Sequence, residues 1–380
     1  MLIPNNVQKT KMFQYAGASR FAYNWALARE IENYEKGGKF ISDAELRKEF
    51  TKLRHSDEYA WLLNISNNVT KQAIKDACTA YKNFFKGLQK FPRFKSKKRS
   101  MPKFYQDNVK IRFSDTHVKF EGFSSSRKAN KQKMNWVRLA EHGRIPTDVK
   151  YMNPRISFDG LNWWISVCVE FPDCRETLND DGVGIDLGIK DLAVCSDGTK
   201  YKNINKSQKV KKSEKQKRRL QRSISRSYEK NKKGESYCKT NNVIKKEKLL
   251  LKRNHRLTNI RKNYLNQTIS EIINRKPRFI CIEDLNVSGM MKNRHLSKAV
   301  QAQGFFWFRK QLEYRCSDKG IQLIVADRFY PSSKLCSCCG NIKKDLKLSD
   351  RVYRCECGNM IDRDFQASIN LKTYGEKFAS

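Results

Sequence analysis

The chain of 380 residues lacks a long hydrophobic run and lacks a recognisable export signal. No apolar stretch approaches the roughly 18 residues that a membrane-spanning helix needs, which excludes an integral helical membrane protein. The first residues also lack the basic segment and apolar core of a secretory signal. We therefore expect a soluble cytoplasmic protein with no membrane partner.

Acidic side chains are scarce beside basic ones. The chain has 39 Asp and Glu against 78 Lys and Arg, for a formal net charge of +39 at pH 7. A chain this basic repels itself unless a polyanion is bound, so nucleic acid is the expected partner. Histidines are also few, and none of the five lies in a His-Asn-His nuclease context, which argues against a second nuclease domain of that type.

The stretch 181–198 is the centre of the sequence pattern. Apolar residues alternate there with glycines, and a second apolar run ends at an Asp-Gly turn, which predicts a β-hairpin with Asp186 on its first strand. Two later acids lie on other predicted elements: Glu283 ends an apolar strand, and Asp364 begins an apolar helix. We expect folding to gather these three carboxylates in an α/β domain.

Three clustered carboxylates are typical of two-metal phosphodiester hydrolysis. Such a site holds two Mg²⁺ (or Mn²⁺) ions roughly 4 Å apart, and hard cations prefer carboxylate oxygens. Side chains alternate along a strand, so Glu283 and Asp284 face opposite sides, and Glu283 is favoured because it lies within the apolar strand. In the third position Asp364 is favoured, with Asp362 left open as the alternative.

The first half of the chain combines helical and strand patterns. Residues 7–90 have apolar positions at helical spacing, with a capping box at Ser42 and Glu45. Residues 109–171 alternate with period two, which predicts a small antiparallel barrel. Between them, residues 86–103 mix cations with aromatics, as a nucleic-acid contact or a solvated loop would. The candidate contacts in this half are Arg20, Asn24, Arg93, Lys95, Lys97 and Lys98.

The tract 207–262 is the most basic part of the chain, with 21 Lys and Arg against 4 Asp and Glu. It predicts two helices with one strongly cationic face, which either binds nucleic acid or is merely solvated. Its candidate contacts are Arg218, Arg219 and Arg222. Farther on we expect a polar loop at 290–300 and a buried strand at 321–325. Between them, residues 305–314 predict an aromatic-rich helix whose rings are assigned to the core, with base stacking as the alternative.

Five of the twelve cysteines cluster near the C-terminus. Cys336-x-x-Cys339 and Cys355-x-Cys357 are each followed by glycine, and four thiolates on two such turns are typical of a structural zinc ribbon. Cys338 is a spare thiol that could substitute or stay free. Disulfide pairing is the alternative, and a reducing compartment disfavours it.

These motifs together resemble those of the transposon-encoded TnpB (OrfB) family, relatives of compact type V CRISPR effectors. The likeness covers nearly the whole chain. It is carried by residues 20–25 (RFAYNW), 91–95 (FPRFK), 184–188 (GIDLG), 282–287 (IEDLNV), 332–340 (SSKLCSCCG), 355–358 (CECG) and 362–364 (DRD).

The resemblance implies an RNA-guided DNA endonuclease with an RNase H-like (RuvC) nuclease domain and an inserted zinc ribbon. Its catalytic carboxylates would be Asp186, Glu283 and Asp364, and its zinc ligands would be Cys336, Cys339, Cys355 and Cys357. The implied domains are a wedge β-barrel at 1–6 and 91–178, recognition helices at 7–90, the nuclease domain at 179–330 and 359–380 with basic helices at 207–270, and a nucleic-acid-binding ribbon at 331–358.

The partners implied by the resemblance are a guide RNA from the transposon end and double-stranded DNA beside a short adjacent motif. One protein would bind one RNA, in association with the bacterial nucleoid. Two features depart from the family pattern: the usual strand before the Leu-x-Pro segment is missing ahead of Met1, and Gln366 replaces an asparagine with a longer amide.

Two rival functions remain open at this point. The first is an RNA-guided repressor of the same fold that binds DNA without cutting it, which would have no need of an intact carboxylate set. The second is a DNA-strand-transferring transposase, which would have no need of a guide.

Overall fold

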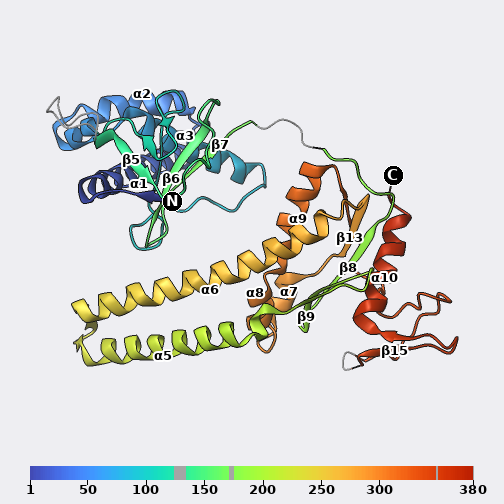
Figure 1. The fold of residues 1–380 in the computed structure, drawn as a ribbon. Helices are drawn as coiled ribbons and strands as arrows, with labels where there is room; N and C mark the ends of the chain where they lie inside the picture. Colours follow the sequence, from blue (N-terminus) through green and yellow to red (C-terminus); the bar gives the residue numbers. More distant parts are fainter. Residues whose placement is uncertain (124–133, 171–174, 348–349, 380) are drawn as a thin grey trace. The chain divides into compact units, whose positions relative to one another are not determined.

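The structure is a computed structural model, and it describes residues 1–123, 134–170, 175–347 and 350–379. The chain divides into two compact units, residues 1–171 and 172–380 (Figure 1). Each unit has hydrophobic clusters of its own. No helix among the described residues is long and apolar enough to cross a membrane.

The first unit contains an antiparallel sheet of seven strands in the order β2-β6-β7-β1-β5-β4-β3. The strands are β1 (Leu2–Ile3), β2 (Lys103–Tyr105), β3 (Arg112–Phe113), β4 (His117–Lys119), β5 (Trp136–Leu139), β6 (Met152–Phe158) and β7 (Trp163–Cys168). A strand does form at the first residues, since Leu2 pairs with Leu139 on one side and Trp163 on the other. β2 and β3 are the edges of the described sheet, so barrel closure stays a prediction.

Helices pack on this sheet and share its core. They are α1 (Asn6–Glu35), α2 (Asp43–Arg54), the 3₁₀ segment η1 (Asp57–Asn64) and α3 (Asn67–Phe85). The predicted capping box at Ser42 and Glu45 is confirmed at the start of α2. One hydrophobic cluster joins Met12 and Tyr15 of α1 to Phe104 and Val118 of the strands. The helices at 7–90 therefore do not have a core separate from that of the sheet.

The second unit contains a mixed sheet of five strands in the order β10-β9-β8-β13-β14. The strands are β8 (Val183–Leu187), β9 (Asp191–Cys195), β10 (Lys200–Lys202), β13 (Phe279–Glu283) and β14 (Gln322–Ala326). β8 and β9 form the predicted antiparallel hairpin, whereas β8, β13 and β14 run parallel. β13 is apolar up to its last residue because helices cover both faces of the sheet.

The described residues of this unit form six helices: α5 (Gln208–Lys230), α6 (Asn241–Ile273), α7 (Val287–Lys292), α8 (Ser297–Gln303), α9 (Phe305–Lys319) and α10 (Arg363–Glu376). A 3₁₀ turn η2 (Ile204–Lys206) precedes α5, and a hairpin of β11 (Lys232–Lys233) and β12 (Ser236–Tyr237) connects α5 to α6. Figure 1 shows α6 and α9 on one side of β8 and β13, with α10 on the other. Ile269 and Phe308 pack on Ile280 of the first face, and Leu371 packs on Cys281 of the second.

Residues 290–300 do not form the polar loop that the sequence predicts. Asn286 begins α7 by accepting a hydrogen bond from the Gly289 N–H, and α8 follows after a short turn. Val300 and Gln303 of α8 are buried. Two helices this short, of which only α8 buries side chains, do not show a clear helical period in the sequence.

Candidate active site

Strand register places Asp186 beside Glu283. β8 and β13 are parallel neighbours, and Ile185 is paired with Ile282. Asp186 and Glu283 are the next residues of the two strands, so their side chains leave the same face of the sheet side by side. Both are partly buried. Two carboxylates thus lie at the carboxyl ends of adjacent parallel strands, where open α/β sheets commonly bind ligands.

Helix α10 brings Asp364 to the same place. A Cβ atom on Gly184 would lie 2.1 Å from the Ser368 carbonyl oxygen and 2.3 Å from the Lys372 amide nitrogen, so only glycine allows the α10 backbone to lie this close to β8. Asp362 caps the helix, because its Oδ1 accepts hydrogen bonds from the backbone N–H groups of Asp364 and Phe365 at 3.1 Å each. Asp364 therefore lies in the first turn of α10, near Asp186.

The charges of this cluster oppose one another. Burial raises the pKa of the Asp186 carboxyl well above its usual value, and the negative charges of Glu283 and Asp364 raise it further. Burial also raises the pKa of Glu283, against the opposing effects of a hydrogen bond from Ser332 and the charge of Arg363. A divalent cation among these groups would remove that repulsion. The three acids predicted from the sequence are therefore brought together, and their chemistry suits Mg²⁺.

The two alternative acids have other partners. Asp284 Oδ1 accepts a hydrogen bond from Arg309 Nη1 at 2.7 Å, and its Oδ2 accepts two from Arg328. Asp362 caps α10 and lies 3.4 Å from the Lys200 ammonium. These contacts support the choice of Glu283 and Asp364 over their neighbours.

A hydrogen-bonded network that the sequence did not reveal supports Glu283. Ser332 is only 4% exposed, and its Oγ donates to Glu283 Oε1. Asn370 Nδ2, on α10, donates to the carbonyl oxygens of Ser332 and Leu335 at 2.7 Å each. Gln366 Nε2 donates to the same Leu335 oxygen at 2.6 Å. The longer amide of Gln366 thus contacts the segment before the zinc ligands. Ser332 lies inside a motif singled out in the sequence, but nothing in the pattern assigned it a role.

The four predicted zinc ligands form one cluster. The Sγ atoms of Cys336, Cys339, Cys355 and Cys357 all lie within 4.8 Å of one another, and Cys338 is exposed and outside this group. Burial would raise the pKa of the Cys336 thiol, but hydrogen bonds from the Cys339 backbone and the Asn359 amide lower it to about 6. Four thiols at this spacing, one readily ionised, fit a tetrahedral Zn²⁺ ion.

Two short strands and one bridge build the ribbon around these thiols. β15 (Val352–Arg354) pairs with β16 (Met360–Asp362), and Leu335 pairs with Ile342. Among the residues that the structure describes, these cysteines are the one group of three or more His, Cys, Asp or Glu side chains placed to share a single metal ion.

Three of the predicted nucleic-acid contacts of the first unit line one hollow. Arg20, Lys97 and Lys98 surround a cavity of ≈ 730 Å³ together with the rings of Phe13 and Phe158. Arg93 is exposed outside this cavity.

Asn24 and Lys95 are bonded to each other instead. Asn24 Nδ2 donates to the Lys95 carbonyl and its Oδ1 accepts from the Lys95 N–H, both at 2.8 Å. The Lys95 ammonium lies 3.1 Å from the centre of the Tyr23 ring, and burial lowers its pKa to about 7. These contacts give Asn24 and Lys95 a structural role, and their contact with nucleic acid stays a prediction.

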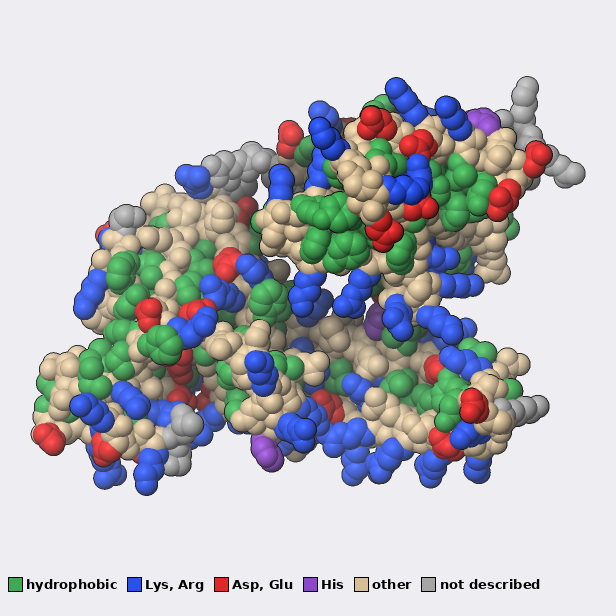
Figure 2. Space-filling model, turned by 180° about the vertical axis from the view of Figure 1, so that it is seen from behind, with side chains coloured by type: hydrophobic (Ala, Val, Ile, Leu, Met, Phe, Trp, Pro, Cys, Tyr) green, Lys and Arg blue, Asp and Glu red, His purple; other side chains and the backbone are tan. Residues whose placement is uncertain are grey.

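The predicted contacts of the second unit lie on an open cationic surface. Arg218, Arg219 and Arg222 are exposed on α5, whose Val210 and Ile224 are buried on the opposite side. Figure 2 shows Lys and Arg side chains along the helix pair α5 and α6. The predicted helical pair is thus confirmed, and its contact with nucleic acid stays a prediction.

Three family profiles match the chain. Residues 1–39 match one described as "Helix-turn-helix domain" (OrfB_IS605), residues 166–294 match "Probable transposase" (OrfB_IS605), and residues 305–371 match "Cas12f1-like, TNB domain". The last of these matches contains all four clustered cysteines.

Curated relatives match over most of their length. "Putative RNA-guided DNA endonuclease InsQ" of Escherichia coli (strain K12) is 30% identical over 373 residues, covering 93% of this chain and 86% of that protein. "Putative RNA-guided DNA endonuclease" of Streptomyces pristinaespiralis is 28% identical, covering 98% of this chain and 87% of that protein.

A solved structure supports the fold. "Cryo-EM structure of the Cas12f1-sgRNA-target DNA complex" contains a chain that matches with a TM-score of 0.61 at 14% identity, covering 95% of this chain and 81% of that one. At this identity the likeness concerns the fold alone. Taken with the relative that is 30% identical over nearly the whole sequence, these matches show that the chain belongs to the TnpB/OrfB IS605 family.

Proposed function

We propose that this protein is an RNA-guided endonuclease that cuts double-stranded DNA beside a short transposon-adjacent motif. The observation that carries the proposal is the convergence of Asp186, Glu283 and Asp364 from two parallel strands and a helix start. Their mutual repulsion suits a site for divalent cations. The names of the curated relatives support the guided activity.

The three carboxylates would hold two Mg²⁺ (or Mn²⁺) ions. Bound there, the ions would activate a water and stabilise the leaving oxygen of the phosphodiester. Asp186 supplies an acceptor close to both other acids, and it lies on a strand buried on both faces. Ser332 keeps Glu283 oriented by donating a hydrogen bond to one of its oxygens. Asp362 fixes the start of α10 and with it the place of Asp364.

Base pairing would select the target, as in guided nucleases generally, while the protein contacts backbone shape. We propose the exposed arginines of α5 and the hollow at Arg20, Lys97 and Lys98 as contacts for guide RNA and DNA. The protein would act as a monomer with one RNA transcribed from the transposon end. The four clustered cysteines would hold Zn²⁺ in a ribbon that contacts the target.

The domain boundaries also stay part of this proposal. The wedge would comprise residues 1–6 and 91–178, and the recognition helices residues 7–90. The nuclease domain would comprise residues 179–330 and 359–380, with the ribbon at 331–358. The chain's division after residue 171 lies close to the proposed start of the nuclease domain.

The two rival functions require different features of the protein. A binding-only repressor has no use for three converging carboxylates, and a strand-transferring transposase has no use for a guide. One matching profile is described as "Probable transposase", so the strand-transferring transposase is retained as the second candidate function. RNA that co-purifies with the protein would favour the guided activity.

The test uses protein purified with its transposon-end transcript and a plasmid that matches the guide. We expect Mg²⁺-dependent cutting by the parent and none by Asp186→Ala, with target binding retained. Asp318→Ala is the matched control, since Asp318 is an exposed acid on α9. Guided binding without cutting by the parent would support the repressor, and absence of bound RNA would overturn the proposal.

A further inference from the structure

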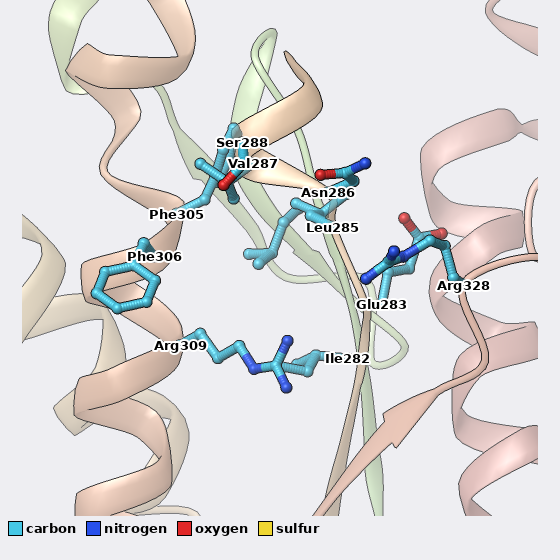
Figure 3. Close-up of a pocket in the computed structure, with 11 residues that line it drawn as sticks. Ile282, Glu283, Leu285, Asn286, Val287, Ser288, Phe305, Phe306, Arg309 and Arg328 are labelled. Carbon is cyan, nitrogen blue, oxygen red and sulfur yellow. The ribbon is translucent and has the colours of Figure 1, made fainter. Parts of the chain in front are cut away.

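A cavity of ≈ 190 Å³ lies beside Glu283 within the second unit (Figure 3). Its walls come from the ends of β8 and β13, the start of α7 and the start of α9. The apolar part of the lining is Leu187, Ile282, Leu285, Val287 and Phe305. Glu283 is the one member of the carboxylate cluster in this lining, and none of the four clustered cysteines belongs to it.

An exposed aromatic ring forms one side of the cavity. Phe306 is 64% exposed, whereas Phe305 and Phe308 on the same helix are buried in the core. The prediction of a core helix at 305–314 is therefore right for Phe305 and Phe308 and wrong for the exposed rings of Phe306 and Tyr314. An aromatic face left in contact with water, at the rim of a cavity, offers a flat surface for stacking.

Two arginines lie around the same space, and both contact Asp284, while Arg309 Nε also donates to Glu313 Oε1 at 3.0 Å. Asp284 accepts from Arg309 Nη1 through one oxygen and from Arg328 Nε at 3.0 Å through the other. Both arginine side chains remain partly exposed. Figure 3 shows Phe306 and Arg309 projecting from α9 on one side, with Glu283 and Arg328 on the other. Cationic groups are thus placed within the surroundings of a candidate catalytic carboxylate.

We propose that this cavity binds one unpaired nucleotide of the DNA strand being cut. Its base stacks on Phe306, and its phosphate lies near Arg309 and Arg328, next to the phosphodiester held at Glu283. Stacking on an aromatic ring tolerates any base, which suits a nuclease whose sequence choice is made by pairing. This inference rests on the proposed nuclease function and adds the position of the substrate strand.

The experiment combines removal of the Phe306 ring with removal of a single base from the DNA strand that is cut. The cut position is first mapped with the guide-loaded parent protein, and an abasic nucleotide is then placed at each position around it. We expect one position where the missing base slows single-turnover cutting by the parent roughly 5- to 150-fold. Phe306→Ala should be slow to the same degree with or without that base, and Phe306→Trp should restore the difference.

A matched control lies on the same helix. Tyr314 is 69% exposed and does not line the cavity, so Tyr314→Ala should respond to the abasic series as the parent does. A readout that needs no cutting uses 2-aminopurine at the sensitive position, in an Asp186→Asn background with Ca²⁺. Its fluorescence should be quenched with Phe306 present and not with Phe306→Ala.

The outcomes separate this inference from the proposed function. If Phe306→Ala and the missing DNA base slowed cutting independently of each other at every abasic position, the inference would be overturned while the protein remained a working nuclease. The inference would be overturned in the same way if the Phe306-dependent change in cutting rate followed missing bases in the guide RNA and not in the DNA. A parent protein that does not cut, or an Asp186→Asn variant that does, would overturn both.

Discussion

Ser332 Oγ donates a hydrogen bond to Glu283 Oε1, and this contact joins the segment before the zinc ligands to the strand of the candidate active site. The Ser332 carbonyl accepts in turn from Asn370 of α10, the helix that begins beside Asp364. One buried serine thus contacts, directly or through one amide, the elements that supply two of the three carboxylates. Its removal should affect the chemistry as well as the fold.

Replacing Ser332 by alanine should make cutting more sensitive to acid. The hydrogen bond lowers the pKa of Glu283 against the effect of burial, so the pKa rises when the bond is lost. A smaller fraction of Glu283 is then ionised at low pH, and a hydrogen bond to a charged group is worth about 1.5–3 kcal/mol. We expect a rate loss of roughly tenfold or more at the acid end of the profile, which diminishes as pH rises.

The measurement is the single-turnover cutting rate against pH at several Mg²⁺ concentrations. Ser332→Thr keeps the hydroxyl and should restore most of the acid limb, and Ser333→Ala, at the adjacent serine, should resemble the parent. An equal loss at every pH would show that Ser332 acts only on the stability of the fold.

Replacing Asp186 by asparagine should stabilise the protein while abolishing cutting. Its pKa lies above the usual value in the folded chain, so the ionised form is less favourable there than in the unfolded chain. The stability contributed by this group is therefore present at low pH and is lost as pH rises through the raised pKa. At neutral pH the neutral amide removes the penalty, and each 1 kcal/mol gained raises Tm by about 2–4 °C in a unit of this size.

Calorimetry at pH 7.5 without divalent cations is the direct check, with Asp318→Asn as the control. Added Mg²⁺ should raise the Tm of the parent and have less effect on Asp186→Asn. Cutting should fall by at least about 10³-fold, since the loss of a metal ligand removes several kcal/mol of transition-state stabilisation. A lower Tm for Asp186→Asn in the absence of metal would contradict the electrostatic argument.

Replacing Gly184 by alanine should separate α10 from β8. The added methyl would meet backbone atoms of Ser368 and Lys372, which cannot rotate away as a side chain could. Overpacking of this kind costs about 1–3 kcal/mol or more and would move Asp364 away from Asp186. Gly17→Ala is the matched control, because a Cβ there meets nothing within 4 Å and Gly17 lies inside α1.

The two alanine variants should change stability in opposite directions. Gly17→Ala should be neutral or stabilising by up to about 1 kcal/mol, since alanine is favoured over glycine in a helix. Thermal unfolding of both variants tests this, and Mg²⁺-dependent cutting is compared between Gly184→Ala and the parent alone, because Gly17 lines the hollow at Arg20. Normal cutting by Gly184→Ala would show that Asp364 does not need the close approach of α10.

The sequence predicted the elements whose pattern is local. Periodicity and spacing predict four of these features: the hairpin carrying Asp186, the apolar strand ending at Glu283, the capping box at Ser42 and the four clustered cysteines. Ser332 was not assigned a role because its partner lies 49 residues away in the chain and no local rule pairs them. Distant partners of this kind are visible only in the folded chain.

Helix faces and short helices were harder to predict for the same reason. Which ring of α9 is exposed depends on where Gly304 begins the helix and on what packs against it. The sequence of residues 290–300 predicts a loop because polar residues dominate it, and α7 buries no side chain while α8 buries only Val300 and Gln303. Asn24 was predicted to face nucleic acid, but its amide bonds to the backbone of Lys95 from a segment 71 residues away.

Loss of a zinc ligand should impair cutting although no zinc ligand is a candidate catalytic residue. Leu335 and Cys336 begin the ribbon, and the Leu335 carbonyl accepts from Asn370 and Gln366 of α10. Ser332 lies three residues before Leu335 and contacts Glu283. Disorder in the ribbon would therefore disturb both the hydrogen bond from Ser332 to Glu283 and the position of α10, which carries Asp364.

Cys355→Ser and Cys338→Ser form a matched pair for this prediction. Cys355 belongs to the cluster and Cys338 does not, so only the first should lower bound zinc from about one ion per chain towards zero. Cys355→Ser should also lower Tm and slow cutting, since structural zinc contributes directly to folding. The acid limb of its pH profile should move in the same direction as that of Ser332→Ala, because both changes remove support from Glu283. Zinc loss with an unchanged cutting rate and pH profile would show that the ribbon and the carboxylates act independently.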